Sequence, residues 1–224
     1  MRRLAPEIMD DPGQGEADFR AALRDLETLN RITLAYGPTL RFLDRLAKGR
    51  THLSVLDVGA GGGDTLRRIA RWGTARGLTL DLVGLDRSPW SARHAEETGV
   101  PARWITADLF ELDEAERFDA VICSLFAHHL EDEAVVRFLR WLHARARLGW
   151  LVLDLHRHRI PWAAVWAGTR AARMHPMVTH DGPVSIMRGF TREDWRRLVA
   201  EAGVEADIAW AMPFRWAVTG PGRP

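Results

Sequence analysis

The chain of 224 residues is poor in several features that would assign it to a particular class of protein. It has a single cysteine, Cys123, which excludes an internal disulfide and leaves too few thiolates for a structural zinc or iron–sulfur site. It also lacks an excess of charge, because 31 basic residues are balanced by 30 acidic ones. This balance argues against a nucleic acid or an anionic membrane as the main partner.

Long apolar runs are missing as well. The longest, residues 120–127 and 160–168, fall well short of the roughly 20 residues that a membrane-spanning helix needs. Residues 1–16 have neither the continuous apolar stretch nor the small-residue cleavage site of a secretory signal. We therefore expect no membrane span and a cytoplasmic location, with which the single cysteine agrees.

What the sequence contains instead is a regular alternation of short apolar runs with helical patterns. Apolar residues at helical spacing predict two helices between residues 16 and 48, separated near Gly37 and Pro38. From residue 53 the pattern predicts strands at 53–58, 79–85, 102–106, 118–123 and 149–155, and helices at 64–76, 90–98 and 132–146. Such βαβ units predict an α/β domain with a doubly wound, mostly parallel sheet.

The last third of the chain departs from this alternation. Residues 156–189 contain the predicted turn Asp181-Gly182-Pro183, and we interpret them as an insertion over the sheet edge. A capping-box pattern at residues 191–194 predicts a helix that reaches about residue 202. The extended runs at 205–211 and 214–219 are too close together for a crossover and should pair as an antiparallel hairpin. We divide the chain into a helical cap segment, residues 1–50, and a domain of residues 51–224 that carries the cap insertion 156–189.

A glycine-rich turn follows the first predicted strand, in the segment DVGAGGGD at residues 57–64. A strand, a glycine turn and the start of a helix form the first ligand-binding unit of a doubly wound sheet. A dinucleotide fingerprint would place a third glycine at position 64, but the chain has Asp64, whose carboxylate would repel a pyrophosphate. A cationic nucleoside without phosphate, such as S-adenosylmethionine, fits this turn better.

Three acidic residues stand at the carboxyl ends of three successive predicted strands. Asp57 can face the ammonium or sulfonium group of such a ligand, Asp86 can accept from both ribose hydroxyls, and Asp108 can accept from the adenine amino group. The alternatives are an ion pair with an arginine for Asp57 and simple helix caps for Asp86 and Asp108.

With these residues identified, the sequence resembles the class I S-adenosylmethionine-dependent methyltransferases. The matching segments, in the family's order, are VLDVGAGGGDTL, LVGLDRSPWSARHAE, ITADLFEL, FDAVICSLFAHHL and LGWLVLDLHR, and the resemblance covers about residues 53–219. One departure is LGW at residues 148–150, where the family commonly has a Pro-Gly-Gly turn. The resemblance implies a seven-stranded sheet whose last strand is antiparallel. It also implies a cofactor-binding set of Asp57, Gly59, Gly61, Gly63, Asp86, Arg87, Asp108, Leu109 and Ser124.

A histidine pair, His128 and His129, follows the fourth predicted strand at the edge that faces the ligand crevice. Asp154 ends the fifth strand, where a carboxylate can orient an imidazole and raise its basicity. These three residues are the predicted catalytic group, with His128 the first candidate for a general base; the alternative is that the histidines are packing residues. No metal site is expected, because His128, His129, His156 and His158 lack the spacing of a zinc motif.

The insertion also contains aromatic and methionine side chains. Such a cluster either forms the core of a cap or lines a pocket for a flat, apolar substrate. The candidate walls are Tyr36, Trp162, Trp166, Met174 and Met177, and the candidate polar contacts are His175, His180 and Arg188.

The function that this resemblance implies is methyl transfer from S-adenosylmethionine to a small molecule. The segment order and the histidine pair look like bacterial quinone- and polyketide-type methyltransferases, which points to an aromatic or phenolic secondary metabolite and favours an oxygen as the attacked atom. Two alternatives stay open. One is a partner protein that binds the cofactor without chemistry, and the other is an NAD(P)-dependent oxidoreductase in which Arg87 reads a 2′-phosphate.

Overall fold

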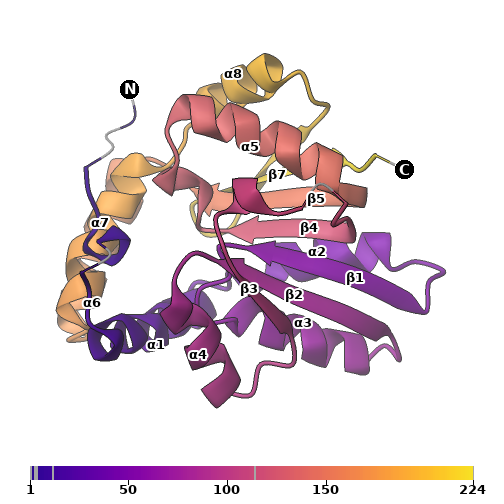
Figure 1. Ribbon diagram of the computed structural model, residues 1–224. Helices are drawn as coiled ribbons and strands as arrows, with labels where there is room; N and C mark the ends of the chain where they lie inside the picture. Colours follow the sequence, from indigo (N-terminus) through magenta and orange to yellow (C-terminus); the bar gives the residue numbers. More distant parts are fainter. Residues whose placement is uncertain (1, 3–4, 12, 114, 224) are drawn as a thin grey trace.

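The computed structural model describes residues 2, 5–11, 13–113 and 115–223 (Figure 1). The elements in chain order are η1 (Ile8–Asp10), α1 (Glu16–Ile32), α2 (Tyr36–Leu46), β1 (His52–Val58), α3 (Asp64–Thr74), β2 (Thr79–Asp86), α4 (Pro89–Glu97), β3 (Arg103–Thr106), η2 (Leu109–Glu111), β4 (Phe118–Ser124), η3 (Ala127–His129), α5 (Asp132–Arg145), β5 (Ala146–Leu155), α6 (Arg159–Ala171), α7 (Pro176–Arg188), α8 (Arg192–Ala202), β6 (Asp207–Ala211) and β7 (Arg215–Pro221). None of the helices in the described ranges combines the length and the apolar character needed to cross a bilayer.

A seven-stranded sheet joins these elements in the order β3-β2-β1-β4-β5-β7-β6. The neighbours from β3 to β5 pair in parallel, whereas β7 is antiparallel to both β5 and β6. The predicted doubly wound sheet, its antiparallel last strand and the closing hairpin are therefore confirmed. The strand order reverses between β1 and β4, and such a reversal opens a crevice at the carboxyl ends of the two strands.

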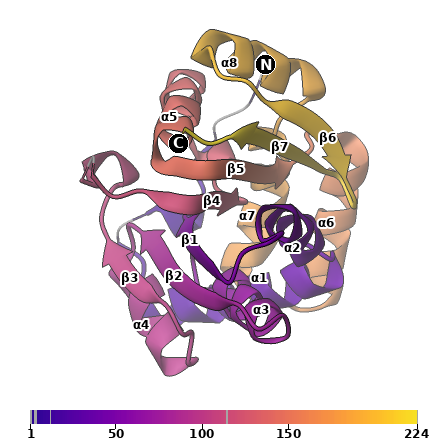
Figure 2. The ribbon, with the colours of Figure 1, turned by 90° about the vertical axis from the view of Figure 1, so that its right-hand side faces the viewer.

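Apolar side chains that alternate along the strands build a core on each face of the sheet. Leu56 and Val58 of β1 pack in a cluster with α5 and α8, and Leu53 and Val55 pack in a second cluster with α2 and α3. Figure 2 shows these two pairs of helices on opposite sides of the sheet. Because both faces are covered, the strand ends are the part of the sheet left to bind a ligand.

A second group of elements lies beyond the carboxyl ends of the strands. Figure 1 shows α1, α6 and α7 gathered there, and α7 contacts η1, η3, α1 and α6. In contrast, α2 packs on the sheet with α3, β4 and β5. Of residues 1–50, therefore, η1 and α1 lie over the strand ends, and the division at residue 50 stays a prediction.

The turn predicted at Asp181-Gly182-Pro183 is wrong, because these residues lie inside α7. The carboxylate of Asp181 accepts the backbone N–H groups of Ile8 and Met9, at 2.8 and 2.9 Å, and the helix packs against α1 and α6. These long-range contacts hold a helical backbone that the local Gly-Pro signal disfavours.

The fifth strand also begins earlier than predicted. α5 ends at Arg145 and β5 starts at Ala146, so no separate turn joins them. Gly149, in the segment that departs from the family pattern, lies within β5 opposite Pro221 of β7. The capping box of Thr191 and Asp194 at the start of α8 is present as predicted.

Candidate active site

A cavity of about 760 Å³ lies at the carboxyl ends of the strands. One side is formed by the glycine turn after β1 and by the ends of β2 and β3, and the other by η1, α1, η3 and α7. The cavity therefore brings the predicted cofactor-binding and catalytic segments together.

The glycine turn has a left-handed backbone at Gly61 (φ 51°) and Gly63 (φ 73°). A Cβ atom on Gly61 would have Leu23 as its nearest neighbour, at 3.6 Å, and Gly61 lines the cavity, as does Gly59. Gly63 differs, because a Cβ there would come within 2.9 Å of Trp104, and Gly63 is not part of the lining. Gly63 is the N-cap residue of α3 and allows close packing there, and its place in the cofactor site stays a prediction.

The carboxylate of Asp86 joins the end of β2 to the glycine turn. It accepts the backbone N–H groups of Gly61 and Ser88, both at 2.8 Å, and Ser88 is the N-cap residue of α4. Asp108 caps η2 by accepting the N–H of Phe110 at 2.9 Å. Both acids line the cavity as well, so the capping and ligand-facing interpretations are both compatible with the structure.

Asp57 is the buried acid at the base of the cavity. It is 2% exposed, lines the cavity, and makes no ion pair or hydrogen bond with the described residues, so the alternative of a partner arginine is wrong for this part of the chain. Burial, together with the negative charges of Asp64 and Asp86, raises the pKa of Asp57 well above its usual value. A cationic ligand is the natural partner for this carboxylate.

The remaining predicted cofactor residues lie on the same side. Arg87, Leu109 and Ser124 all line the cavity, with Arg87 exposed and Leu109 buried. The side chain of Asp64 accepts the hydroxyl of Tyr36 at 2.6 Å, which neutralises none of its charge. The cavity wall near the glycine turn is therefore strongly acidic, as a cationic ligand requires.

His128 is held from behind by Asp154. The Nδ1 atom of His128 lies 2.7 Å from Oδ1 of Asp154, and the backbone N–H of His128 donates to Oδ2 at 3.1 Å. Burial alone would raise the pKa of Asp154, but the His128 imidazole and backbone donors outweigh burial and lower it. Asp154 is fully buried and does not line the cavity, so it can act only through His128.

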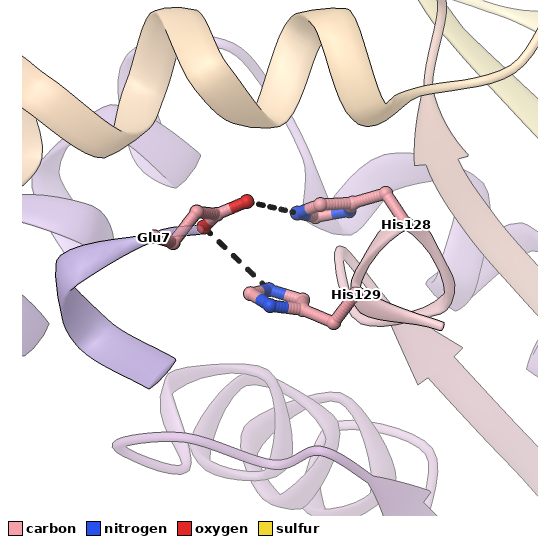
Figure 3. Close-up of side chains that lie close together, drawn as sticks. All are labelled: Glu7, His128 and His129. Carbon is pink, nitrogen blue, oxygen red and sulfur yellow. Dashed lines mark ion pairs between the residues drawn. The ribbon is translucent and has the colours of Figure 1, made fainter. Parts of the chain in front are cut away.

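His129 lies beside His128, with ring centroids 4.4 Å apart. Its Nδ1 atom is 2.8 Å from Oδ1 of Asp10. The Nε2 atoms of both histidines face the carboxylate of Glu7, each at 3.8 Å (Figure 3). Burial raises the pKa of Glu7 to about 7, although His129 and Arg188 pull it down.

Glu7 and Asp10 are site residues that the sequence did not reveal. Glu7 is the N-cap residue of η1 and Asp10 is its last residue, about 120 positions before the histidines and in a segment with no motif. Arg188 fixes this turn by donating to the carbonyl of Ala5 at 3.0 Å and to Asp10 at 3.1 Å. Contacts between residues so far apart in the chain leave no local sequence pattern from which they could be predicted.

Most of the predicted acceptor walls are elsewhere. Among the candidates, Met177 lines the cavity, whereas Tyr36, Trp162, Trp166 and Met174 do not. Trp162 and Trp166 stack on each other on α6 and are 38% and 45% exposed. The apolar wall comes instead from α1 and α7, and includes Phe19, Leu23, Leu26, Met177, Val178 and Ile186.

The predicted polar contacts of the insertion are also absent from the lining, which includes none of His175, His180 and Arg188. His175 caps α7, because its Nδ1 atom accepts the N–H of Met177 at 3.3 Å. Arg188 lies behind the histidine pair and donates to the carbonyls of His128 and His129.

Comparisons with known proteins agree with this geometry. Residues 55–149, from β1 to β5, match the family model of the methyltransferase domain. This match supports the resemblance to S-adenosylmethionine-dependent methyltransferases that the sequence predicts. The printed descriptions of the matches agree with the predicted family, with a methyltransferase and with S-adenosylmethionine as the cofactor.

Two ubiquinone biosynthesis O-methyltransferases are among the similar sequences. That of Paramagnetospirillum magneticum is 34% identical over 133 residues, which are 58% of this chain and 51% of that protein. That of Salmonella typhi is 28% identical over 173 residues, which are 73% of this chain and 66% of that protein. The chain therefore spans about half to two thirds of the length of these relatives.

Similar solved structures show the same fold. The plantazolicin methyltransferase BpumL, in complex with SAH, has a TM-score of 0.66 at 15% identity and covers 93% of this chain and 97% of its own. The magnesium protoporphyrin IX methyltransferase of Synechocystis PCC 6803, with bound SAH, has a TM-score of 0.58 at 15% identity and covers 96% and 90%.

Proposed function

We propose that this protein transfers the methyl group of S-adenosylmethionine to a hydroxyl group of a small aromatic acceptor. The observation that carries the proposal is that one cavity is lined both by the buried carboxylate of Asp57, which has no ion pair with the described residues, and by the carboxylate-backed imidazole of His128. The named O-methyltransferase relatives support the choice of oxygen.

The cofactor residues fit a cationic nucleoside. When bound, S-adenosylmethionine supplies a methyl group made electrophilic by the sulfonium, and the acceptor oxygen displaces it to leave S-adenosylhomocysteine. We assign Asp57 and the backbone of Gly59 and Gly61 to the cationic methionine end. We assign Asp86 to the ribose and Asp108 to the adenine amino group, with Arg87, Leu109 and Ser124 completing the same wall.

The acceptor would lie between α1 and α7. Their apolar side chains, among them Phe19, Leu26 and Val178, suit a flat aromatic ring, and they exclude water from the reacting atoms. Correct alignment of the oxygen, methyl carbon and sulfur is the largest contribution such a site can make, worth up to about 7–11 kcal/mol. We further propose a secondary metabolite as acceptor and a cytoplasmic location.

His128 is the proposed proton acceptor. Its Nδ1 atom faces a carboxylate that can only accept, so the proton lies on Nδ1 and the lone pair on Nε2 is directed toward the cavity side. Asp154 fixes this tautomer and stabilises the imidazolium, and His129 completes the catalytic group. This geometry supports His128 as a base for a phenol, whose pKa of about 10 leaves it largely un-ionised at neutral pH.

The test is incubation of the protein with methyl-labelled S-adenosylmethionine and a panel of phenols, catechols and aromatic amines. The expected result is label in a phenolic product, with equimolar S-adenosylhomocysteine. Binding of the cofactor without any product would favour the partner protein that has no chemistry. Label on amines alone would contradict the assignment of oxygen.

A further inference from the structure

The carboxylate of Glu7 lies between two imidazoles whose outer nitrogens are already occupied. Nδ1 of His128 faces Asp154 at 2.7 Å and Nδ1 of His129 faces Asp10 at 2.8 Å. Both Nε2 atoms are therefore turned inward, and each is 3.8 Å from one oxygen of Glu7 (Figure 3). The three side chains enclose one polar gap in the wall of the cavity.

A negative charge on Glu7 destabilises the folded protein in this position unless a positive charge lies close to it. Its side chain is 3% exposed, and Oε1 has no hydrogen-bond partner among the described residues. The nearest cation is Arg188, whose Nε atom is 3.4 Å from Oε1, but that guanidinium also serves Asp10 and the carbonyls behind the histidines. An incompletely satisfied buried carboxylate lowers stability, so a second compensating charge is expected during function.

We propose that Glu7 is the residue that stabilises the proton taken up by His128 from the acceptor. This inference rests on the proposed function. In the step, the acceptor O–H bond breaks and its proton goes to Nε2 of His128, while the oxygen lone pair forms a bond to the methyl carbon. The carbon–sulfur bond breaks with its electron pair on sulfur. The resulting imidazolium lies between Asp154 at Nδ1 and Glu7 at Nε2.

The surroundings hold Glu7 in place for this role. Asp181 of α7 accepts the N–H groups of Ile8 and Met9, and Arg188 of the same helix donates to Ala5. The N-terminal turn is thus fastened on both sides of Glu7, although α7 lies about 180 positions away in the sequence.

The charges that face the pair come from four elements. They are Asp154 at the end of β5, His129 of η3, Asp10 of η1, and Arg188 and Asp181 of α7. Two more arginines lie nearby: Arg2 donates to the backbone carbonyl of His128 at 3.1 Å, and the positive charge of Arg215 acts on Asp154. Among these groups, Glu7 is the carboxylate that faces the Nε2 atom of His128.

The test compares Glu7→Gln with the wild type and with Glu133→Gln, the same change at an exposed position on α5. Loss of the Glu7 charge lowers the basicity of His128, so the ascending limb of the kcat profile should move about one pH unit lower. The plateau of kcat should fall about tenfold, since a weaker base removes the proton less well. The affinity for S-adenosylhomocysteine should stay within about twofold, and Glu133→Gln should match the wild type.

A series of phenols of increasing acidity provides a readout that packing does not affect. The defect of Glu7→Gln should shrink for a nitrophenol, because that acceptor is already ionised in solution. Glu7→Asp, which keeps the charge, should lie between the wild type and Glu7→Gln. The proposal is overturned if Glu7→Gln lowers kcat equally for all phenols and leaves the ascending limb of the pH profile where it is in the wild type. An unchanged kcat overturns it as well.

Two further outcomes also overturn it. If chelators abolish wild-type activity and a divalent metal restores it, the three side chains are metal ligands and Glu7 has a different role.

Titration of the His128 ring by NMR gives a test independent of turnover. The pKa of His128 should be about one unit lower in Glu7→Gln, and equal pKa values in the two proteins contradict the proposal even if no acceptor is found. Failure of the labelled-methyl assay alone contradicts the proposed reaction.

Discussion

The two sides of the cavity are built in different ways. Apart from Ser124 at the end of β4, the cofactor side comes from short, successive segments between residues 57 and 109, which are the turn after β1 and the ends of β2 and β3. The acceptor side is assembled from η1, α1, η3 and α7, which span residues 8 to 188. Parallel strands bring their carboxyl ends to one edge by topology alone, whereas the acceptor side depends on contacts between distant helices.

The two sides also treat buried charge differently. Asp57 on the cofactor side has no partner of opposite charge among the described residues, and its pKa is raised. Asp154 and Asp10 on the acceptor side each face a histidine, and their pKa values are lowered. Asp57 on the cofactor side is therefore a site for a cation from the ligand, whereas on the acceptor side Asp154 and Asp10 are paired and Glu7, whose pKa is raised to about 7, is incompletely satisfied.

The largest effect should come from filling the glycine turn. Gly61→Phe places a ring in the cavity and should weaken S-adenosylhomocysteine binding at least about 100-fold by calorimetry, since the ligand and the ring compete for one volume. Gly77→Phe is the matched control, because Gly77 also has a positive φ but faces open space. Similar losses in both variants would mean that backbone strain, and not the cavity, causes the effect.

Removing the base should separate chemistry from binding. His128→Asn keeps a donor toward Asp154 and should lower kcat about 100-fold, the range typical of a lost general base. Cofactor affinity should change less than about threefold, because His128 lies on the acceptor side. A kcat within twofold of the wild type would remove His128 from the mechanism.

Asp57→Asn should weaken binding and strengthen the fold. S-adenosylmethionine affinity should fall about tenfold, because the cation loses its carboxylate. The pKa of Asp57 is higher in the folded protein than its value of about 4 in the unfolded chain. The free energy of unfolding therefore falls as the pH rises from about 4 through the pKa of the folded state, because the folded protein is stabilised only while this carboxyl is protonated. The ligand-free variant should melt about 2–4 °C higher than the wild type at pH 8 and show a smaller gain at pH 5. A lower melting temperature at pH 8 would contradict the unpaired acid.

The smallest effect is expected on the outer surface of α6. Trp166→Ala removes an exposed ring that does not line the cavity, so KM for the acceptor should stay within about twofold. Met177→Ala, inside the cavity, should raise that KM about fivefold. If Trp166→Ala raised the KM for the acceptor more than Met177→Ala did, Trp166 would line the acceptor site, as the sequence predicted.

The sequence was informative where one residue's position follows from one strand. Asp57, Asp86 and Asp108 each end a predicted strand, and the cavity is lined by all three. The pairing of His128 with Asp154 followed from the same rule, because β4 and β5 are neighbours.

The errors share one physical cause, which is long-range packing. The turn predicted at residues 181–183 is part of α7, because that helix packs against α1 and α6. Tyr36 was expected as a wall and instead donates to Asp64. Glu7 carries no motif, and only the fold of α7 over η1 brings it to the histidines. Periodicity and spacing record none of these contacts.

The central claim is that the carboxylate-lined side of the cavity binds an adenosyl sulfonium. The most direct measurement is calorimetric titration of the purified chain with S-adenosylmethionine and, separately, with NADPH. The account predicts one S-adenosylmethionine per chain with a dissociation constant of about 1–50 μM, proton release on binding, and no saturable heat with NADPH. Saturable binding of NADPH without any binding of S-adenosylmethionine would contradict it.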